Sequence, residues 1–135
     1  MYDQVGNMTD IWSTNGIHTQ FSYNTRNMAT SITSMPLSLF YTYSENGNII
    51  KITDSTGTIP VELNYTYDSR GQLKTAQVNK LSGVETVSYS YDGTSNRISE
   101  MWKNNQNQIL SQYTYTYQPG DYLVSKGNQT STINY

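Results

Sequence analysis

A Tyr-x-Tyr pair returns along the chain at a fixed interval, and this repeat limits the fold more than any other feature. The first tyrosine of the pair stands at positions 41, 65, 89 and 113, so that 65−41, 89−65 and 113−89 each give 24 residues. The last copy reads YTYTY and therefore also offers Tyr115 and Tyr117 as its pair. A constant period of this size is typical of proteins in which each repeat is one supersecondary unit. The sequence therefore predicts an array of similar units.

Apolar and polar residues alternate before and through each tyrosine pair. Over residues 59–67 the order is Ile, Pro, Val, Glu, Leu, Asn, Tyr, Thr and Tyr, and residues 37–43 and 109–117 read in a similar way. A period of two is typical of a strand with one apolar face, and here the tyrosines extend the apolar row. Asp, Asn, Gly and Ser, which favour turns, follow each pair. We expect shorter strands after these turns, at residues 49–54, 73–79, 97–103 and 122–126.

These patterns predict an all-β fold, an antiparallel meander of tandem β-hairpins with about two strands per repeat and a single curved sheet. If successive repeats stand in register, their tyrosine rings become neighbours on one face, where each pair contributes about 0.2–1 kcal/mol. The aspartate after the second tyrosine is expected to cap the turn and the following glycine to permit it. The residues assigned to this structural repeat are Tyr41, Tyr43, Gly47, Tyr65, Tyr67, Asp68, Gly71, Tyr89, Tyr91, Asp92, Tyr115 and Tyr117.

The segments YTYDSRGQL, YSYDGTSNRI, YTYSENGNI and YDQVGNMT resemble YD repeats, also called Rhs repeats, whose usual form is Tyr-x-Tyr-Asp-x-x-Gly-Arg/Asn-Leu/Ile. The similarity covers nearly the whole chain, with units that start near residues 2, 21, 41, 65, 89 and 115. Ser44 and Gln118 replace the aspartate of the repeat. The turn after Asp92 reads as one residue longer than the others, and the copy at 21–24 lacks the glycine, which predicts a different turn there.

The resemblance implies a family of long bacterial proteins, including polymorphic toxins, toxin complexes and wall-associated proteins, with relatives among the animal teneurins. Their repeats form a continuous β-sheet that winds into a hollow shell, which in the toxins encloses a toxic segment. It therefore implies a non-catalytic scaffold over residues 1–135 as one domain, expected to be a fragment or a truncated member of a longer shell. Such a parent would be secreted or lie at the cell surface.

Members of this family often end the shell with a Trp-Asp-Pro region that bears an autoproteolytic pair of aspartates. The two tryptophans of this chain stand in DIWST and EMWKN, and neither is followed by Asp-Pro. The resemblance therefore does not imply self-cleavage for this chain.

The composition argues against several classes of protein. The net charge is −2, and charged residues are scattered singly, so no basic patch predicts nucleic-acid binding or membrane attachment. The chain has no cysteine, which excludes disulfides, thiolate catalysis and cysteine zinc sites. The sequence shows no signal peptide and no apolar stretch of membrane-spanning length. We expect no cofactor and no metal.

Few residues suggest catalysis or metal binding. His18 is the only histidine, and few carboxylates stand near it in the sequence, so we expect a strand-end histidine rather than a zinc ligand or a triad member. Asp68 and Asp92 occupy equivalent turns, which favours turn capping over an acid–base pair. Oxygen ligands for calcium are present without a recognised calcium motif, at Asp54, Asp121, Asn46 and Asn48. No nucleophile, base and orienting group come together, so an enzyme is not predicted.

The aromatic residues leave one alternative open. Sugars stack on aromatic rings, so an exposed tyrosine row with interleaved amides could form a carbohydrate-binding module. The candidate residues are Tyr65, Tyr67, Tyr89, Tyr91 and Trp102. Packing of the rings against one another is favoured, because the alternation joins them to Ile, Val and Leu on one face, and both tryptophans are expected to pack at a sheet face or end. The expected partners are neighbouring repeats, or a second copy that pairs through an open sheet edge, and an encapsulated toxin segment.

Overall fold

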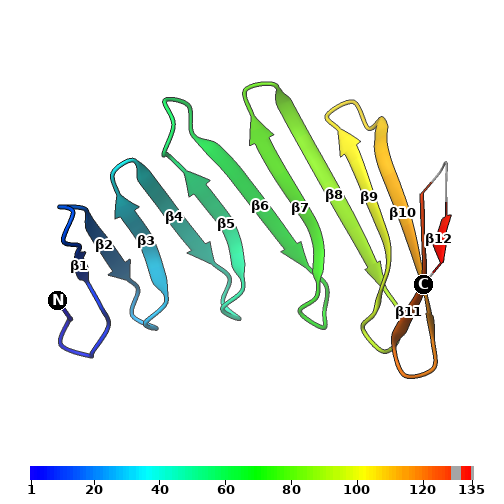
Figure 1. Cartoon of the computed structure of the whole chain (residues 1–135), viewed down its shortest axis with the longest axis horizontal. Coiled ribbons are helices and arrows are strands. Elements are labelled where there is room, and N and C mark those ends of the chain that lie inside the picture. The colour runs from blue at the N-terminus through cyan, green and yellow to red at the C-terminus, as the bar shows by residue number, and fades with distance from the viewer. Residues whose placement is uncertain (129–131, 135) are drawn as a thin grey trace. The chain divides into compact units, whose positions relative to one another are not determined.

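The computed structural model describes residues 1–128 and 132–134, and the regular structure among them consists of β-strands. Strand order follows chain order from β1 to β12, and the strand pairs described below are antiparallel (Figure 1). This confirms the all-β meander of hairpins. The internal contacts divide the chain into two compact units, Met1–Asn64 and Tyr65–Tyr135, which are described one at a time.

The first unit places its apolar residues and tyrosines in register. Its strands are β1 (Asp10–Trp12), β2 (His18–Tyr23), β3 (Ala29–Ser34), β4 (Leu37–Tyr43), β5 (Ile49–Asp54) and the start of β6 (Val61–Tyr67). Tyr41 lies opposite Ile52 on β5, and Ile52 lies opposite Leu63 on β6. Side chains of directly opposed residues share a face of the sheet, so the tyrosine and the aliphatic residues form one row.

The second unit continues with longer strands. It holds the end of β6 and then β7 (Leu73–Lys80), β8 (Gly83–Tyr91), β9 (Arg97–Asn104), β10 (Ile109–Gln118), β11 (Tyr122–Asn128) and β12 (Thr132–Asn134). Val87 lies opposite Ala76 on one side and Trp102 on the other. The next row joins Tyr89, Glu100 and Tyr113 across β8, β9 and β10.

One long strand begins later than the alternation predicts. We expected residues 59–67 to form a strand, but β6 begins at Val61, and Ile59 lies in the preceding loop with 49 % of its surface exposed. Proline has no backbone N–H to give to the ladder, so Pro60 ends the preceding loop instead of extending the strand.

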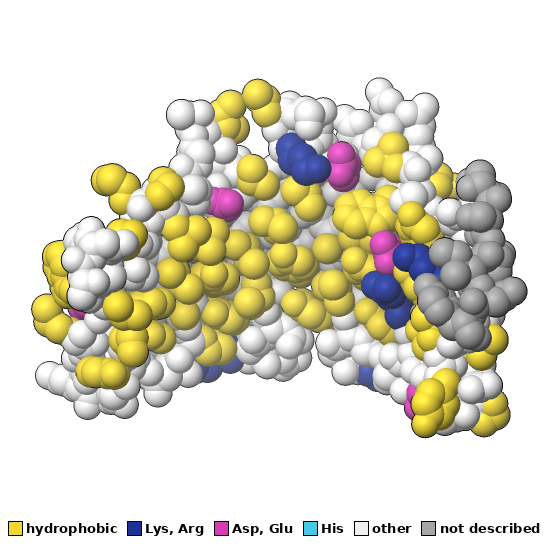
Figure 2. Space-filling view, viewed as in Figure 1, with side chains coloured by type: hydrophobic (Ala, Val, Ile, Leu, Met, Phe, Trp, Pro, Cys, Tyr) yellow, Lys and Arg dark blue, Asp and Glu magenta, His cyan; other side chains and the backbone are white. Residues whose placement is uncertain are grey.

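Few of the described side chains are buried. Val87, with 2 % of its surface exposed, and Tyr115, with 7 %, are the buried hydrophobic residues. Most tyrosines of the repeat are half-buried, whereas the residue between the two tyrosines is exposed, as at Thr42, Thr66 and Ser90. Figure 2 shows hydrophobic side chains gathered over the strands of the viewed face. Stability must therefore come from contacts along a face and from the turns rather than from a thick core.

The face opposite the tyrosines carries pairs of hydroxyl groups. Thr66 and Thr75, Ser90 and Ser99, and Thr116 and Ser125 each join by a hydrogen bond of 2.6 Å between their side-chain oxygens. The first member of each pair stands between two tyrosines, so the polar position of the repeat also makes a regular cross-strand contact.

A five-residue turn follows the second tyrosine, and we call it the post-tyrosine turn. Its copies are residues 3–7, 24–28, 44–48, 68–72 and 92–96. In each, the N–H of the first residue donates to the carbonyl of the fifth, and the N–H of the fourth donates to the carbonyl of the first. The fourth residue has a positive φ, as at Gly47 (86°) and Gly71 (77°). This combination is a common hairpin connection.

Two copies expected to differ have this same turn. Ser95 takes the positive φ of 78° after Asp92, so that turn has the usual length and Gly93 is not its left-handed residue. Asn27 takes a φ of 58° in the copy without glycine. The expectations of a longer and of a different turn were wrong, because the glycine pattern was taken as a requirement. Asparagine reaches the left-handed region with little strain, and serine does so here at a higher cost.

The 118–121 turn does differ from the post-tyrosine turns, with positive φ at both Gly120 and Asp121.

Two alanine substitutions in neighbouring repeats test this assignment. Gly71→Ala is expected to cost about 1–2 kcal/mol, because a Cβ at positive φ is strained even though the space around it is open. Gly93→Ala also meets no neighbouring atom, and its φ is not positive, so its expected cost is about zero or a small gain. Chemical denaturation of both variants compares them. Equal effects would contradict the assignment of the left-handed position.

Candidate functional site

The second tyrosine of a pair connects consecutive repeats through its hydroxyl. The hydroxyl donates to the carbonyl of the residue that follows the previous post-tyrosine turn. Bonds of this kind run from Tyr23 to Met8 (2.8 Å), Tyr43 to Ala29 (2.6 Å), Tyr91 to Leu73 (2.9 Å) and Tyr117 to Arg97 (3.0 Å). A tyrosine, unlike a phenylalanine, can therefore fill the apolar row and also hold the main chain of the preceding strand, as Tyr91 of β8 does with Leu73 of β7.

The same bond settles the register of the last repeat, where the sequence offers two pairs. Tyr117 makes the bond to the Arg97 carbonyl, and the ladder of β10 shifts register between Thr116 and Tyr117. An equivalent shift precedes Tyr23, Tyr43 and Tyr91. Tyr115 and Tyr117 are thus the repeat pair, and Tyr113 lies one alternation earlier.

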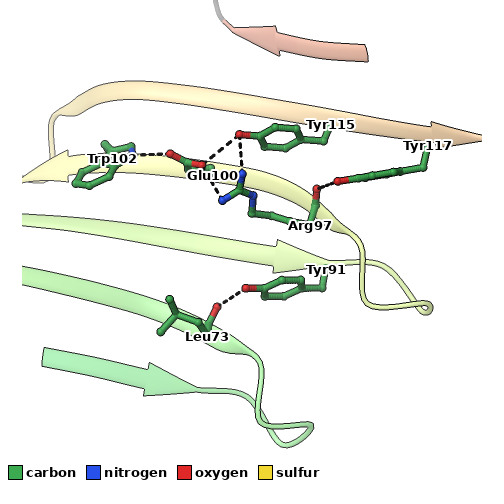
Figure 3. A network of polar contacts seen from close by, with 7 residues as sticks. All are labelled: Leu73, Tyr91, Arg97, Glu100, Trp102, Tyr115 and Tyr117. Atoms are coloured by element: carbon green, nitrogen blue, oxygen red, sulfur yellow. Dashed lines mark hydrogen bonds and ion pairs between the residues drawn. The ribbon is translucent and has the colours of Figure 1, made fainter. Parts of the chain in front are cut away.

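A polar cluster lies on the tyrosine face of the second unit (Figure 3). The Glu100 side chain, 16 % exposed, accepts hydrogen bonds from Trp102 Nε1 (2.7 Å) and from the Tyr115 hydroxyl (3.2 Å). The guanidinium of Arg97 is 3.2 Å from Glu100 Oε2 and donates to the Tyr115 hydroxyl at 3.2 Å. A carboxylate with this little exposure is tolerated only when its oxygens are paired, and here three side chains supply the partners.

Two cations lie over the tyrosine rings of this cluster. The Arg97 guanidinium is 4.7 Å from the centroid of Tyr115 and 5.5 Å from that of Tyr89. The Lys126 ammonium is 4.3 Å from Tyr113 and 5.7 Å from Tyr115. These distances are typical of cation–π contacts. Tyr115 is therefore held from several sides, which agrees with its burial.

Sequence reasoning did not single out Arg97, Glu100 or Lys126. Glu100 could have been found, because it alternates with Trp102 along β9 and lies opposite Tyr89. Arg97 directly follows a turn and lies beside a register shift, so the alternation alone does not give its face.

The two aspartates of the repeat lie in separate turns and bind main chain. Asp68 Oδ1 accepts from the N–H groups of Arg70 and Gln72, both at 2.9 Å. Asp92 Oδ1 accepts in the same way from Thr94 and Asn96, also at 2.9 Å. Ser44 substitutes for aspartate with one bond of 3.2 Å from the Asn48 N–H.

His18 has an acidic partner that its sequence neighbours did not reveal. Its Nε2 is 2.8 Å from Asp10 Oδ1, and its ring stacks on Trp12 with centroids 3.8 Å apart and an angle of 6° between the planes. The pKa of Asp10 is lowered by hydrogen bonds, first from Thr9 and then from His18. Trp12 was expected to pack at a sheet face or end: it lies on β1, the first strand of the sheet, and stacks on His18, but 64 % of its surface is exposed because a three-residue edge strand covers little of its ring.

The residues considered for sugar stacking lie on the tyrosine face. Tyr65, Tyr67, Tyr89, Tyr91 and Trp102 are half-buried. The Tyr91 hydroxyl and the Trp102 indole N–H already donate to partners within the chain. Stacking of a sugar on them stays a prediction.

The calcium candidates do not form a cluster of the kind that holds a metal. Asp54 Oδ1 accepts from the Thr56 N–H at 2.9 Å, and Asp121 Oδ1 accepts from Asn96 Nδ2 at 2.6 Å. Among the described residues, no group of three or more His, Cys, Asp or Glu side chains could hold a metal ion. The described part of the chain also contains no helix with the length and hydropathy to cross a membrane.

Partial burial raises the pKa of five repeat tyrosines, and this predicts alkaline unfolding. Desolvation is the main cause at Tyr43, Tyr65, Tyr89, Tyr91 and Tyr115. A pKa that is higher in the folded state means that stability is complete below the unfolded value of about 10 and is lost as pH rises through the folded values. We expect the loss of β-sheet circular dichroism to coincide with the rise of tyrosinate absorbance. Tyrosinate absorbance that rises while the sheet signal stays constant would contradict this expectation.

The family model described as Teneurin YD-shell matches residues 1–132. The chain belongs to the teneurin YD-shell family. The match confirms the resemblance that the repeats indicate. No curated protein matches the chain.

Solved structures with a similar fold include toxin assemblies. A crystal structure of TcdB2-TccC3-TEV superposes on 93 % of this YD-shell chain with a TM-score of 0.74 and 20 % identity. A crystal structure of TcdB2-TccC3-Cdc42 covers 88 % with a TM-score of 0.73 and 20 % identity. A structure of the Photorhabdus luminescens Tc holotoxin pore with a mutated TccC3 covers 93 %, also with a TM-score of 0.73 and 20 % identity. The YD-shell chain spans only 6–7 % of the length of these chains.

Proposed function

We propose that this YD-shell chain is a non-catalytic wall segment of a larger shell, which encloses a toxin segment or serves as a scaffold at the cell surface. The observation that carries the proposal is the connection between repeats, in which the second tyrosine of one repeat bonds to the main chain of the repeat before it. These bonds join one repeat to the next in a growing sheet, and they need no catalytic group. The small share of the length of the similar toxin chains agrees with one segment among many.

The open sheet edges support neighbouring repeats, or a second copy of the chain, as partners of this segment. The sheet order begins at β1 and ends at β12, so each of these two strands has one edge without a neighbouring strand. On β1 that edge is paired in part, because Asp10 exchanges main-chain hydrogen bonds with Met1. In a longer shell the neighbouring repeats pair with these edges. In the chain by itself, a second copy takes their place.

Light scattering across a concentration series, combined with an edge variant, tests the proposal. We expect association that rises with concentration. Ile11→Lys in β1 is expected to weaken it, because Ile11 is 43 % exposed and a lysine on an edge strand opposes pairing. Val5→Lys, at a residue that is also exposed but precedes β1, is the control and should leave association unchanged. A monomer at every concentration would count against edge pairing.

A further inference from the structure

An arginine in the first unit joins two successive post-tyrosine turns. Arg26 is the third residue of the 24–28 turn, and its guanidinium reaches the start of the 44–48 turn. Nη2 donates to the Ser44 carbonyl at 2.9 Å, and Nη1 donates to the Glu45 carbonyl at 2.6 Å. The fork of the guanidinium thus binds the first two carbonyls of the next turn.

The second unit repeats this arrangement independently. Arg70 is the third residue of the 68–72 turn, and it donates to the Asp92 carbonyl from Nη2 at 3.2 Å and to the Gly93 carbonyl from Nη1 at 3.3 Å. The position of the arginine in its turn and the positions of the two acceptors in the next turn are the same as for Arg26. The receiving residues differ, Ser-Glu in one case and Asp-Gly in the other.

We propose that Arg26 and Arg70 are positioning residues that fix the next post-tyrosine turn by binding its main chain. Because both acceptors are carbonyls, the contact does not depend on the side chains of the receiving turn. This allows repeats of different sequence to follow one another in the same register, a role that the tyrosine pattern does not include.

The first carbonyl that each arginine binds is also the acceptor of the hydrogen bond that closes the receiving turn. The Ser44 carbonyl accepts from Gly47 N–H at 3.0 Å as well as from Arg26, and the Asp92 carbonyl accepts from Ser95 N–H at 3.3 Å as well as from Arg70. A carbonyl oxygen has two lone pairs and can serve both donors. The amides of Gly47 and Ser95 therefore report the state of the two contacts.

Other turns use side chains at the same edge. Asn7 Nδ2 donates to Asn27 Oδ1 at 3.1 Å, which joins the 3–7 and 24–28 turns. Thr94 Oγ1 and Asn96 Nδ2 donate to Asp121 Oδ1 at 3.2 and 2.6 Å. Contacts between successive turns are thus a repeated feature of each unit, and the arginines form the version that binds only main chain.

Amide hydrogen exchange on the full chain tests the proposal with two variants that control for each other. Arg70→Met removes the donors but keeps an apolar stem, and we expect exchange at Ser95 to become about three- to tenfold faster, with Gly47 unchanged. Arg26→Met should do the reverse, with faster exchange at Gly47 and no change at Ser95. Glu45→Ala alters a receiving side chain and should leave Gly47 unchanged, because its carbonyl remains.

Each result of this experiment decides the question. Faster exchange only in the turn after the substituted arginine supports the proposal. Unchanged exchange there, or faster exchange confined to the turn of the arginine itself, would overturn it. A uniform rise of the exchange rate over all strands would show that the arginine stabilises the whole sheet and does not position one turn, and this result would also overturn the proposal. Arg70→Lys keeps the charge without the fork, so exchange at Ser95 should fall between wild type and Arg70→Met, and wild-type exchange would show that the fork is not needed.

Discussion

Tyr115→Ala is expected to destabilise the second unit by about 3–5 kcal/mol, the range for removal of a large buried aromatic side chain. Tyr115 is 7 % exposed, its ring is flanked by Arg97 and Lys126, and its hydroxyl donates to Glu100. Removal of the ring leaves a cavity and takes a donor from a carboxylate that has little exposure. Small domains have a total stability of about 5–15 kcal/mol, so urea denaturation should show a large shift of the midpoint.

Two further substitutions separate the parts of this effect. Tyr115→Phe keeps the ring beneath both cations and loses only the hydroxyl bonds, for an expected cost of about 0.5–1.5 kcal/mol. Tyr122→Ala removes a tyrosine that is 67 % exposed, and its cost should be within about 0.5 kcal/mol. If Tyr115→Ala and Tyr122→Ala had equal effects, the packing of Tyr115 would be contradicted.

Val87→Ala is the second substitution with a large expected effect, about 2 kcal/mol. Val87 is the largest fully buried side chain among the described residues, and it lies between Ala76 on β7 and Trp102 on β9. A sheet with few enclosed side chains has little capacity to fill the space that two lost methyl groups leave. Denaturation measured by tryptophan fluorescence follows the neighbouring Trp102 as well.

The matched control for this prediction is Val5→Ala in the first unit. Val5 is 70 % exposed, so the same chemical change should alter stability by less than about 0.5 kcal/mol. A cost at Val87 no greater than at Val5 would show that the centre of the second unit is not packed as described.

The period and the alternation predicted most of the fold, because they depend on local chemistry. The strand expected at residues 49–54 has those bounds as β5, and the strand class, pairing direction and hairpin order are confirmed. The turn residues were less well predicted. A glycine was assumed at each left-handed position, whereas Asn27 and Ser95 fill two of them.

The contacts between repeats could not be predicted, since they depend on register across strands. The hydroxyl bond of Tyr117 reaches Arg97, and the arginine fork of Arg70 reaches carbonyls more than twenty residues away. A register shift at the second tyrosine interrupts the period of two, so the face of Arg97 cannot be counted from the sequence. The contact between His18 and Asp10 could not be predicted for the same reason, because it depends on the register of the hairpin formed by β1 and β2.

A nuclear Overhauser spectrum of the chain in solution tests the central claim, that within each unit the second tyrosine of a repeat binds the repeat before it. We predict cross-peaks from the ring of Tyr91 to Leu73 and from the ring of Tyr117 to Arg97, together with the opposed pairs Val87–Trp102 and Tyr89–Glu100. Rings that show contacts only within their own strands, or none between repeats, would contradict the claim.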